Sequence, residues 1–337
     1  MKVKIRWGIL GDAGIARNYV IPGMQVGKYS KVVAIASRDI KKSKKTAANM
    51  GIEKAYGSYE ELLADKEIDA VYIPLPNHLH VEWSIKAMEA GKHVLCEKPF
   101  ALSTDDVKRA IKVRDVTGVK IGEAFMVRTH PQWLKAKELT TSEDFGKLRA
   151  VQGFFSYSNF DSSNIRNSYS SDMGGGGLWD IGCYPVNTSR FLFIEEPTRV
   201  IAMAEYDPKF KTDILASAIL DFPSGQATFI SSTQISPYQR MLAVGTKKHV
   251  EIKIPFNSPS TFPTEIYYDD SNVEQEERNR IIIDTCHQYT LQGDAFSKAI
   301  IDKTDIPVPL EDTLYNTAVL TALYKSTKSG NWENVTV

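Results

Sequence analysis

The chain lacks several features that mark particular classes of protein. Its 337 residues include only three cysteines, Cys96, Cys183 and Cys286, which lie far apart and form no CxxC pair. This spacing argues against a disulfide framework or a structural zinc site and fits a reducing compartment. The scattered histidines and carboxylates show no spacing typical of metal ligands, so we predict that the protein holds no metal.

The sequence also lacks an excess of either charge and any long apolar run. Lys+Arg and Asp+Glu both total 41, which gives no electrostatic reason to expect nucleic acid or an anionic membrane as a partner. No stretch approaches the roughly 18 uncharged apolar residues of a membrane-spanning helix. The start, MKVKIRWGIL, runs straight into a strand-and-glycine pattern without a signal-type apolar region, so we expect a cytoplasmic protein.

The order of predicted strands and helices changes near residue 122. The chain is also longer than most proteins with a single hydrophobic core, so two domains are expected. Residues 1–122 alternate short β-rich runs with helical segments, which predicts a doubly wound parallel sheet of the Rossmann type. Residues 123–337 contain long runs of alternating apolar and polar residues, typical of an antiparallel sheet with one covered face. We therefore predict an α/β protein with an N-terminal dinucleotide-binding Rossmann domain. The second domain is predicted to be α+β, with a large, open-faced, mainly antiparallel sheet for substrate binding and oligomerisation.

A glycine-containing loop follows the first predicted strand and opens a helix. In GILGDAGIA, Gly11, Ala13 and Ala16 occupy the three positions of the G-x-G-x-x-G/A fingerprint, although alanine replaces the usual second glycine. Such a loop lets backbone N–H groups and a helix N-terminus approach a pyrophosphate, whereas the alternative is an ordinary turn between strand and helix. The predicted cofactor loop consists of Gly11, Asp12, Ala13, Gly14, Ile15 and Ala16.

The end of the second predicted strand, IASRD, bears on the choice of dinucleotide. Ser37 and Arg38 offer a hydroxyl and a guanidinium, which suit the 2′-phosphate of NADP, and Lys42 adds positive charge. Asp39 supports the competing interpretation, because an acidic residue near this position binds the ribose hydroxyls of NAD. We predict NADP as the cofactor, with NAD as the alternative.

Two further segments follow parallel strands of the first domain, and ligands of such sheets bind beyond the carboxyl ends of the strands. PLPNHLH contributes Pro74, Leu75 and Asn77, and EKP contributes Glu97 and Lys98. His80 is a further candidate for the cofactor site, the alternative being a residue at a helix N-terminus in solvent. In the second domain, GGGGLWDIGCYPVN places Asp180 and Tyr184 four positions apart, so that they lie on one face of a predicted helix. Its four glycines are expected to let a ligand come close to the backbone.

These segments together resemble the glucose-fructose oxidoreductase/inositol dehydrogenase (Gfo/Idh/MocA) family. The resemblance covers essentially the whole chain and rests on the fingerprint loop, AGKHVLCEKPFAL, GGGGLWDIGCYPVN and DIPVPLEDTLYNTAVLTALYKS. NIR at residues 164–166 and tyrosine at position 184 are similar to the NADP-linked sugar (xylose-type) dehydrogenases and the dihydrodiol dehydrogenases. The inositol dehydrogenase branch carries histidine at the place of Tyr184 and is disfavoured.

The resemblance implies that Lys98 and Tyr184 act on the substrate beside the nicotinamide, and that the Lys98–Pro99 bond is cis. Oxidation of a carbinol requires a proton acceptor within hydrogen-bond reach, and a nearby ammonium favours the phenolate form of tyrosine. We therefore predict Tyr184 as the acid/base, Lys98 as its positively charged partner, and Asp180 as the residue that orients Lys98 or the substrate. The alternative for Tyr184 is a core aromatic with a satisfied hydroxyl.

The remaining candidates flank these residues. Arg128 is expected to reach the cofactor or substrate, the alternative being an interdomain ion pair. Arg166 and Trp179 are candidates for the substrate pocket, although Trp179 is equally suited to packing.

These features predict an NAD(P)-dependent oxidoreductase that transfers hydride between the carbinol carbon of a sugar or polyol and the nicotinamide. The alternatives are a dihydrodiol dehydrogenase, a reductase of dicarbonyls or anhydro sugars, and a dinucleotide-binding sensor without catalysis. We further expect a homodimer or homotetramer formed through the open sheet face.

Overall fold

The computed structural model describes residues 4–269 and 279–337, and its chain divides into two compact units. Unit 1 comprises residues 1–129 and 287–314, and unit 2 comprises residues 130–286 and 315–337. Unit 1 therefore includes a late segment of the chain that lies beyond the sequence boundary predicted at residue 122. The assignment of a role in binding to each predicted domain stays a prediction.

Unit 1 is built on a six-stranded sheet, sheet A, in which every described pairing is parallel and the strand order is β3-β2-β1-β4-β5-β6. The order reverses beside β1, as in a doubly wound fold. The predicted Rossmann-type sheet is confirmed. Its strands are β1 (Ile5–Leu10), β2 (Ser30–Ala36), β3 (Lys54–Tyr56), β4 (Ala70–Ile73), β5 (His93–Cys96) and β6 (Ile121–Glu123).

Helices connect these strands, and their ends follow from local sequence. Ser58 and Ser103 cap α3 and α5 through their side-chain oxygens, and Gly51 and Gly118 end α2 and α5 in the left-handed conformation. The helical elements of unit 1 are η1 (Ala16–Val20), α1 (Ile21–Gln25), α2 (Ile40–Met50), α3 (Tyr59–Ala64), η2 (Asn77–Leu79), α4 (His80–Glu89), α5 (Thr104–Thr117), η3 (Met126–Thr129) and α9 (Gln288–Asp302).

Helix α9 joins unit 1 from the far end of the sequence. The Trp7 ring of β1 lies 5.6 Å from the Phe296 ring of α9, and the Trp7 indole N–H donates to Ser297 Oγ at 2.9 Å. Both aromatic rings are buried, so this contact extends the core of unit 1.

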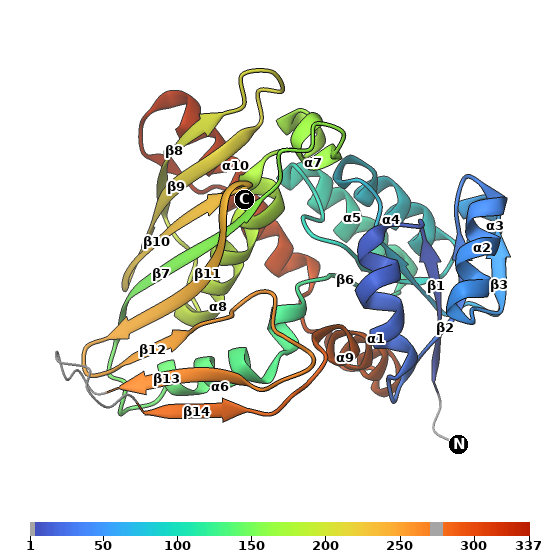
Figure 1. Ribbon diagram of the computed structural model, residues 1–337, viewed down its shortest axis with the longest axis horizontal. Helices are drawn as coiled ribbons and strands as arrows, with labels where there is room; N and C mark the ends of the chain where they lie inside the picture. The colour runs from blue at the N-terminus through green and yellow to red at the C-terminus, as the bar shows by residue number, and fades with distance from the viewer. Residues whose placement is uncertain (1–3, 270–278) are drawn as a thin grey trace. The chain divides into compact units, whose positions relative to one another are not determined.

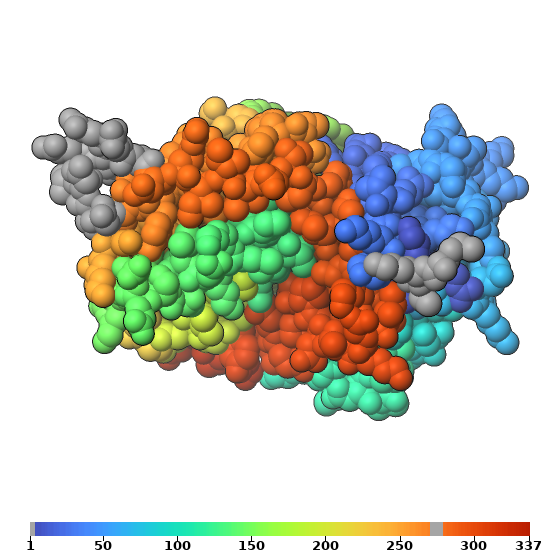
Figure 2. All heavy atoms as spheres, turned by 90° about the horizontal axis from the view of Figure 1, so that it is seen from below, coloured from blue at the N-terminus to red at the C-terminus, as the bar shows by residue number. Residues whose placement is uncertain are grey.

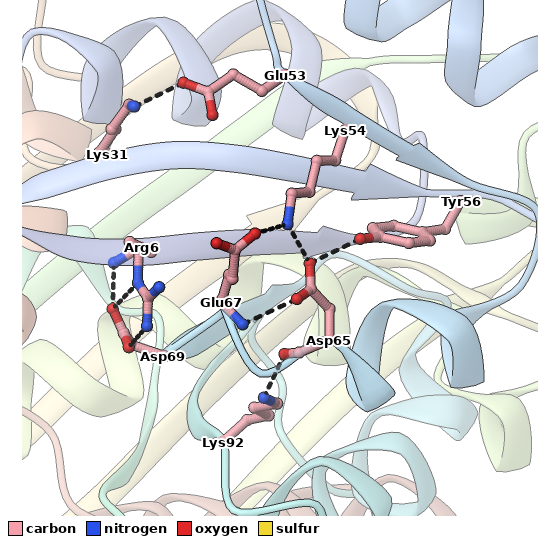
Figure 3. Close-up of polar contacts among 9 residues, drawn as sticks. All are labelled: Arg6, Lys31, Glu53, Lys54, Tyr56, Asp65, Glu67, Asp69 and Lys92. Carbon is pink, nitrogen blue, oxygen red and sulfur yellow. Dashed lines mark hydrogen bonds and ion pairs between the residues drawn. The ribbon is translucent and has the colours of Figure 1, made fainter.

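Charged side chains link the amino-terminal ends of the sheet A strands (Figure 3). Arg6 and Asp69 form a two-pronged ion pair, with Nη2–Oδ1 at 2.7 Å and Nε–Oδ2 at 3.0 Å. Lys54 pairs with Asp65 at 2.7 Å, and Lys92 Nζ donates to the Asp65 carbonyl at 2.7 Å. These contacts stabilise the amino-terminal ends of the strands. Cofactors of doubly wound proteins bind beyond the opposite, carboxyl ends.

Among the described residues, unit 2 contains a nine-stranded sheet, sheet B, in the order β14-β13-β12-β11-β7-β10-β9-β8-β15. The described pairs are antiparallel except β10 with β7, which is parallel, so the predicted mainly antiparallel sheet is confirmed. Its strands are β7 (Leu148–Ser158), β8 (Arg199–Tyr206), β9 (Asp213–Phe222), β10 (Gly225–Ser232), β11 (Gln234–Gly245), β12 (His249–Ile252), β13 (Thr264–Asp269), β14 (Arg280–Ile283) and β15 (Glu333–Asn334).

Helices cover one face of sheet B (Figure 1). Helix α8 (Cys183–Phe193) contacts β7, and α6 (Pro131–Thr140) contacts β12 and β13. The space-filling view shows the green atoms of α6 beside orange atoms of the strand region that includes β13 (Figure 2). Unit 2 also contains α7 (Ile165–Ser168), η4 (Ser171–Met173) and η5 (Leu178–Gly182), while α10 (Leu310–Ser329) begins in unit 1 and continues in unit 2.

The opposite face of sheet B carries a groove of about 680 Å³. Its lining includes Met203, which is 73% exposed, and Ile219 and Tyr238, which are also exposed. The sheet therefore has one face under helices and one open face, as the alternating sequence pattern predicts.

The helical stretch that follows the glycine-containing loop is divided just before its proline. A π-helical segment, η1, is followed by α1, with Pro22 in the first turn of α1. Proline is tolerated there because the first N–H groups of a helix have no intrahelical partner.

Candidate active site

The predicted phosphate loop joins β1 to η1. Gly11 has a φ of 123°, and a Cβ at this position would lie 2.9 Å from Leu75 Cδ2. Glycine is therefore favoured here by the backbone conformation, whereas the end of the Leu75 side chain can shift to relieve the close contact. A Cβ at Gly14 would meet nothing within 4 Å, so there is open space at the start of the helical segment.

The Asp12 side chain points into the protein rather than toward solvent. Its carboxylate is 2% exposed, pairs with Arg17 Nη1 at 2.7 Å and accepts from Thr46 Oγ1 at 3.1 Å. These bonds tie the loop at Asp12 to η1 through Arg17 and to α2 through Thr46. A role for Asp12 in cofactor binding would therefore use its backbone.

The end of β2 presents positive charge. Arg38 is exposed and hydrogen-bonds with Tyr59, and Lys42 Nζ lies 3.9 Å from Asp12 Oδ2. Asp39 instead caps α2, since its carboxylate accepts from the Lys41 N–H at 2.9 Å. This capping role occupies the residue on which the NAD interpretation depends.

His80 connects the turns that follow β4 and β5. Its imidazole is fully buried, with Nε2 2.7 Å from the Leu75 carbonyl and Nδ1 2.8 Å from the Pro99 carbonyl. Burial lowers the pKa of His80 to about 4. The alternative of a solvent-exposed histidine is wrong, because the helix start that carries it packs under both turns.

Lys98 lies at the carboxyl end of β5 and is 9% exposed, and the Lys98–Pro99 bond is cis, as expected. Glu97 accepts a hydrogen bond from the buried Tyr72 hydroxyl and another from the Lys98 N–H at 3.3 Å. The side chain of Glu97 is thus held by the strand next to β5. These contacts fix the backbone from which Lys98 projects.

Glu123 is a supporting residue that the sequence analysis missed. It is 3% exposed, and its carboxylate accepts from the Phe100 N–H at 2.8 Å and from Thr313 Oγ1 at 2.9 Å. It therefore anchors the EKP turn to the start of α10. A carboxylate at the carboxyl end of a parallel strand, in VKIGEA, was the signal that could have identified it.

Arg128 forms an ion pair within unit 1. Its Nη1 lies 3.1 Å from Asp312 Oδ2, and its side chain is 12% exposed. The two partners come from η3 and the first turn of α10. This contact is local to unit 1, and a role for Arg128 in binding the cofactor stays a prediction.

In unit 2, two residues hold the carboxylate of Asp180. Arg166 Nε lies 3.1 Å from Oδ1, and the Tyr157 hydroxyl donates to Oδ2 at 2.7 Å. Asp180 is 4% exposed, and burial raises the pKa of Tyr157 well above its usual value. The structure thus brings together the predicted Arg166 and Asp180. It adds Tyr157, whose place on the same face of β7 as Phe155 follows from the alternation in FFSYS.

Tyr184 lies at the start of α8 against sheet B. It is 6% exposed, with its ring edge-on to Phe155 at 5.6 Å and tilted on Phe256 at 5.4 Å. Trp179 is 4% exposed and stacks on Tyr324 at 5.2 Å. Within unit 2, Trp179 therefore packs as a core aromatic residue, which was the alternative to a place in the substrate pocket.

The glycine run before Trp179 has a different cause from the one expected. A Cβ at Gly175 would lie 1.8 Å from the Tyr169 carbonyl oxygen, and one at Gly176 would lie 2.0 Å from Asp213 Oδ1. Gly176 also has a φ of 100°. The expectation that these glycines make room for a ligand is wrong at both positions, because the protein itself fills the space.

The described part of the chain shows neither a cluster of metal ligands nor a helix that could cross a membrane. Residues 4–269 and 279–337 contain no group of three or more His, Cys, Asp or Glu side chains arranged to hold a metal ion. Within the same ranges, no helix combines the length and the apolarity needed to cross a bilayer.

Comparison with known families gives two matches that together cover most of the chain. Residues 5–125 match the "Oxidoreductase family, NAD-binding Rossmann fold", and residues 133–251 match the "GFO/IDH/MocA C-terminal domain". The chain therefore belongs to the Gfo/Idh/MocA family of oxidoreductases, as its motifs indicate. It is an NAD(P)-binding oxidoreductase whose relatives include sugar dehydrogenases and reductases.

Relatives match along nearly the whole length of the chain. An uncharacterized oxidoreductase, ORF334, from Rhizobium meliloti is 45% identical over 98% of this chain and 99% of the relative. A D-xylose 1-dehydrogenase (NADP(+)) from Haloferax volcanii is 36% identical over 96% of this chain and 98% of that enzyme. A trans-1,2-dihydrobenzene-1,2-diol dehydrogenase from Xenopus tropicalis is 30% identical over 76% of this chain and 77% of that enzyme.

Solved structures show the same fold. KijD10, a 3-ketoreductase from Actinomadura kijaniata in complex with NADP, superposes with a TM-score of 0.87 at 26% identity, covering 96% of this chain and 98% of that one. An aldose-aldose oxidoreductase from Caulobacter crescentus, complexed with glycerol, superposes with a TM-score of 0.88 at 25% identity. That match covers 98% of this chain and 99% of the other.

Proposed function

We propose that this protein is an NADP-dependent oxidoreductase that interconverts a CH–OH group of a sugar or polyol and the corresponding carbonyl. The observation that carries the proposal is the Asp180 carboxylate, held by Arg166 and Tyr157 one helical turn before Tyr184. A fixed carboxylate beside a guanidinium and a phenol offers both donors and acceptors, which suits a substrate with several hydroxyl groups.

The residues at the carboxyl edge of sheet A fit a dinucleotide. The open space at Gly14 and the start of η1 suit a pyrophosphate, and Arg38 and Lys42 offer positive charge for a 2′-phosphate. Asp39 is already used as a helix cap, which disfavours the NAD alternative. The cofactor-binding set is proposed to be Gly11, Asp12, Ala13, Gly14, Ile15, Ala16, Ser37, Arg38, Lys42, Pro74, Leu75, Asn77, His80, Glu97, Lys98 and Arg128.

When bound, the nicotinamide supplies the hydride acceptor or donor. Tyr184 accepts the hydroxyl proton as an alcohol is oxidised and returns it to the oxygen when a carbonyl is reduced. A free phenol titrates near pH ~10 and is a weak base at neutral pH, so a nearby positive charge is needed to favour the phenolate. We assign this role to Lys98 and the orientation of the substrate to Asp180 and Arg166.

The resemblance to KijD10, which was solved in complex with NADP, and to the D-xylose 1-dehydrogenase (NADP(+)) of Haloferax volcanii supports the choice of NADP. Solved structures of KijD10 also include one tyrosine-to-phenylalanine variant and one lysine-to-alanine variant. In this chain we assign proton transfer to a tyrosine, Tyr184, and the supporting positive charge to a lysine, Lys98.

Oxidation of a dihydrodiol is the second candidate function. It is favoured by the relative named for that reaction and by the aromatic surroundings of Tyr184. Reduction of dicarbonyls or anhydro sugars and a sensor without turnover remain the alternative outcomes of the assay.

The assay measures formation or consumption of reduced nicotinamide by absorbance. The panel contains aldoses, polyols, a dihydrodiol, a dicarbonyl and an anhydro sugar, each tested with NADP(H) and NAD(H). Turnover of a sugar with a lower KM for NADP supports the proposal. Turnover of the dihydrodiol alone would favour the second candidate. Tight NADPH binding without turnover of any substrate would favour a sensor.

We also propose that the open face of sheet B pairs with a second copy of the chain. The groove on that face is lined mainly by apolar or uncharged side chains such as Met203, Ile219 and Tyr238, and exposed apolar surface of this kind marks interaction sites. Light scattering at micromolar concentration should report a dimer or tetramer. Met203→Glu should shift the protein toward the monomer, and a monomeric wild type would contradict the proposal.

A further inference from the structure

A buried carboxylate, Asp213, lies at the start of β9 and outside the residue set proposed for catalysis. Its side chain is 1% exposed, and both carboxylate oxygens accept hydrogen bonds. The Leu178 N–H donates to Oδ2 at 2.6 Å, and the Tyr324 hydroxyl donates to Oδ1 at 2.6 Å. Asp213 therefore links η5, which carries Asp180, to α10.

The glycine loop is shaped around this carboxylate. A Cβ at Gly176 would lie 2.0 Å from Asp213 Oδ1, and a Cβ at Gly177 would lie 3.3 Å from Oδ2. The left-handed φ of Gly176 lets the backbone pass this close without a side chain. The glycines and Asp213 thus form one fitted unit.

The same contacts extend to the residues proposed to bind substrate. The Asp180 N–H donates to the Gly176 carbonyl at 3.1 Å, so the position of Gly176 sets the backbone of Asp180. Tyr324, the second partner of Asp213, stacks on Trp179 with a ring separation of 5.2 Å. Two routes therefore lead from Asp213 to the segment Trp179–Asp180.

Burial destabilises the ionised form of the Asp213 carboxylate. Burial raises the pKa of Asp213 to about 6, and the hydrogen bonds from Tyr324, Leu178 and Gly177 oppose that shift only in part. An apolar side chain at this position would avoid the cost of burial. The carboxylate is the group that can accept from η5 and α10 at once.

We propose that Asp213 is a positioning residue: it fixes the Gly174–Gly177 loop and thereby sets the place of Asp180 for the reaction. The inference rests on the proposed function, in which Asp180 orients the substrate. It goes beyond that function in assigning the geometry of the site to a residue that touches neither substrate nor cofactor.

Asp213→Asn is the direct test. Asparagine is uncharged and offers one acceptor oxygen, so it cannot accept from both Leu178 and Tyr324. If the oxygen stays on the Leu178 N–H, the Tyr324 hydroxyl must turn to accept from the amide NH₂, and the charge-assisted character of both bonds is lost. Small displacements of a catalytic group are costly, so we expect kcat to fall by about 10- to 100-fold. The dissociation constant for NADPH should stay unchanged, because the proposed cofactor residues belong to unit 1. Asp221→Asn on the same strand, which breaks an ion pair with Arg199, is the matched control and should leave kcat unchanged.

A double variant separates positioning from a general loss of stability. Tyr324→Phe keeps the ring on Trp179 and removes one of the two donors. Because D213N and Y324F both disturb the hydrogen bond between residues 213 and 324, the loss of kcat in D213N/Y324F should be smaller than the product of the two single losses. A purely structural role would instead lower the melting temperature of the three variants and leave kcat unchanged.

Hydrogen–deuterium exchange of residues 174–184 reads the loop without any turnover. D213N should exchange faster there than wild type and D221N, and this comparison holds even if the wild type oxidises none of the sugars tested. If D213N fails to fold, Y324F takes its place and must show faster exchange in the same segment. The proposal is overturned if kcat and the exchange of residues 174–184 match wild type while only the melting temperature falls.

Discussion

The buried carboxylate of Asp213 should make stability depend on pH in a way that a single substitution removes. Its pKa is raised from 3.8 to about 6 in the folded protein by burial. The folded state therefore binds this proton more tightly than the unfolded state between about pH 4 and pH 6. Across that window the free energy of unfolding should fall as the pH rises, and above it the contribution of Asp213 should stay constant.

The magnitude follows from the shift in pKa. A shift of about two pH units at about 1.4 kcal/mol per unit corresponds to roughly 3 kcal/mol. Asparagine does not titrate, so the difference in unfolding free energy between wild type and Asp213→Asn should move against wild type by that amount from about pH 4 to pH 7.

Buried histidines, among them His80 and His130, titrate in the same window with the opposite sign. Burial lowers the pKa of His80 and of His130 to about 4, so their proton uptake on unfolding makes the protein more stable as the pH rises toward about 6.5. Both residues are present in wild type and in the variant. Their contributions therefore cancel in the difference.

The assay is urea-induced unfolding of wild type, Asp213→Asn and the control Asp221→Asn at a series of pH values from about 4 to 7. The control pair should differ by an amount that does not depend on pH in the upper part of this range. A constant difference between wild type and Asp213→Asn across the whole range would refute the reasoning, because the carboxyl would then have the same pKa in both states.

Three further predictions concern single substitutions. Arg38→Ala should raise the KM for NADP by about 10-fold or more and leave the KM for NAD nearly unchanged, since it removes the guanidinium proposed to face the 2′-phosphate; equal effects on both cofactors in steady-state kinetics would argue against that role. Gly176→Ala should destabilise the protein by roughly 2 kcal/mol or more in urea unfolding, because the new Cβ would meet Asp213 Oδ1 at 2.0 Å and the φ of 100° disfavours a side chain; an unchanged midpoint would contradict this. The pKa of Asp69 is lowered, because hydrogen bonds and charge from Arg6 outweigh burial, so this pair contributes stability above the unfolded pKa of about 3.8 that is lost as the pH falls; Asp69→Asn should lower the melting temperature at neutral pH and lose its effect in acid, and an equal effect at all pH values would contradict the assignment.

The parts of the fold that follow from local pattern were predictable. The fingerprint loop, the alternation of strands and helices and the capping residues act over short distances along the chain, so the Rossmann-type sheet could be predicted. The return of α9 to unit 1 could not be predicted in this way. It depends on the packing of Phe296 on Trp7, two residues that nothing in the local sequence connects.

The candidate site shows the same limit. Arg166 and Asp180 were identified from their motif, and the structure brings them into contact. Tyr157, Glu123 and Asp213 were not identified, because each is a single residue on a strand whose partner lies elsewhere in the chain. The glycines at 175 and 176 were misinterpreted, since a glycine in the sequence shows that space is needed but not whether protein or ligand fills it.

The most direct test of the proposed reaction is the turnover of Tyr184→Phe compared with wild type. Phenylalanine keeps the ring between Phe155 and Phe256 and removes the hydroxyl to which we assign proton transfer. Tyr315→Phe, at a half-exposed position on α10, is the matched control. The account predicts that kcat falls by about 100-fold or more in Tyr184→Phe, with NADPH binding intact and the control unchanged. Wild-type turnover in Tyr184→Phe would contradict it.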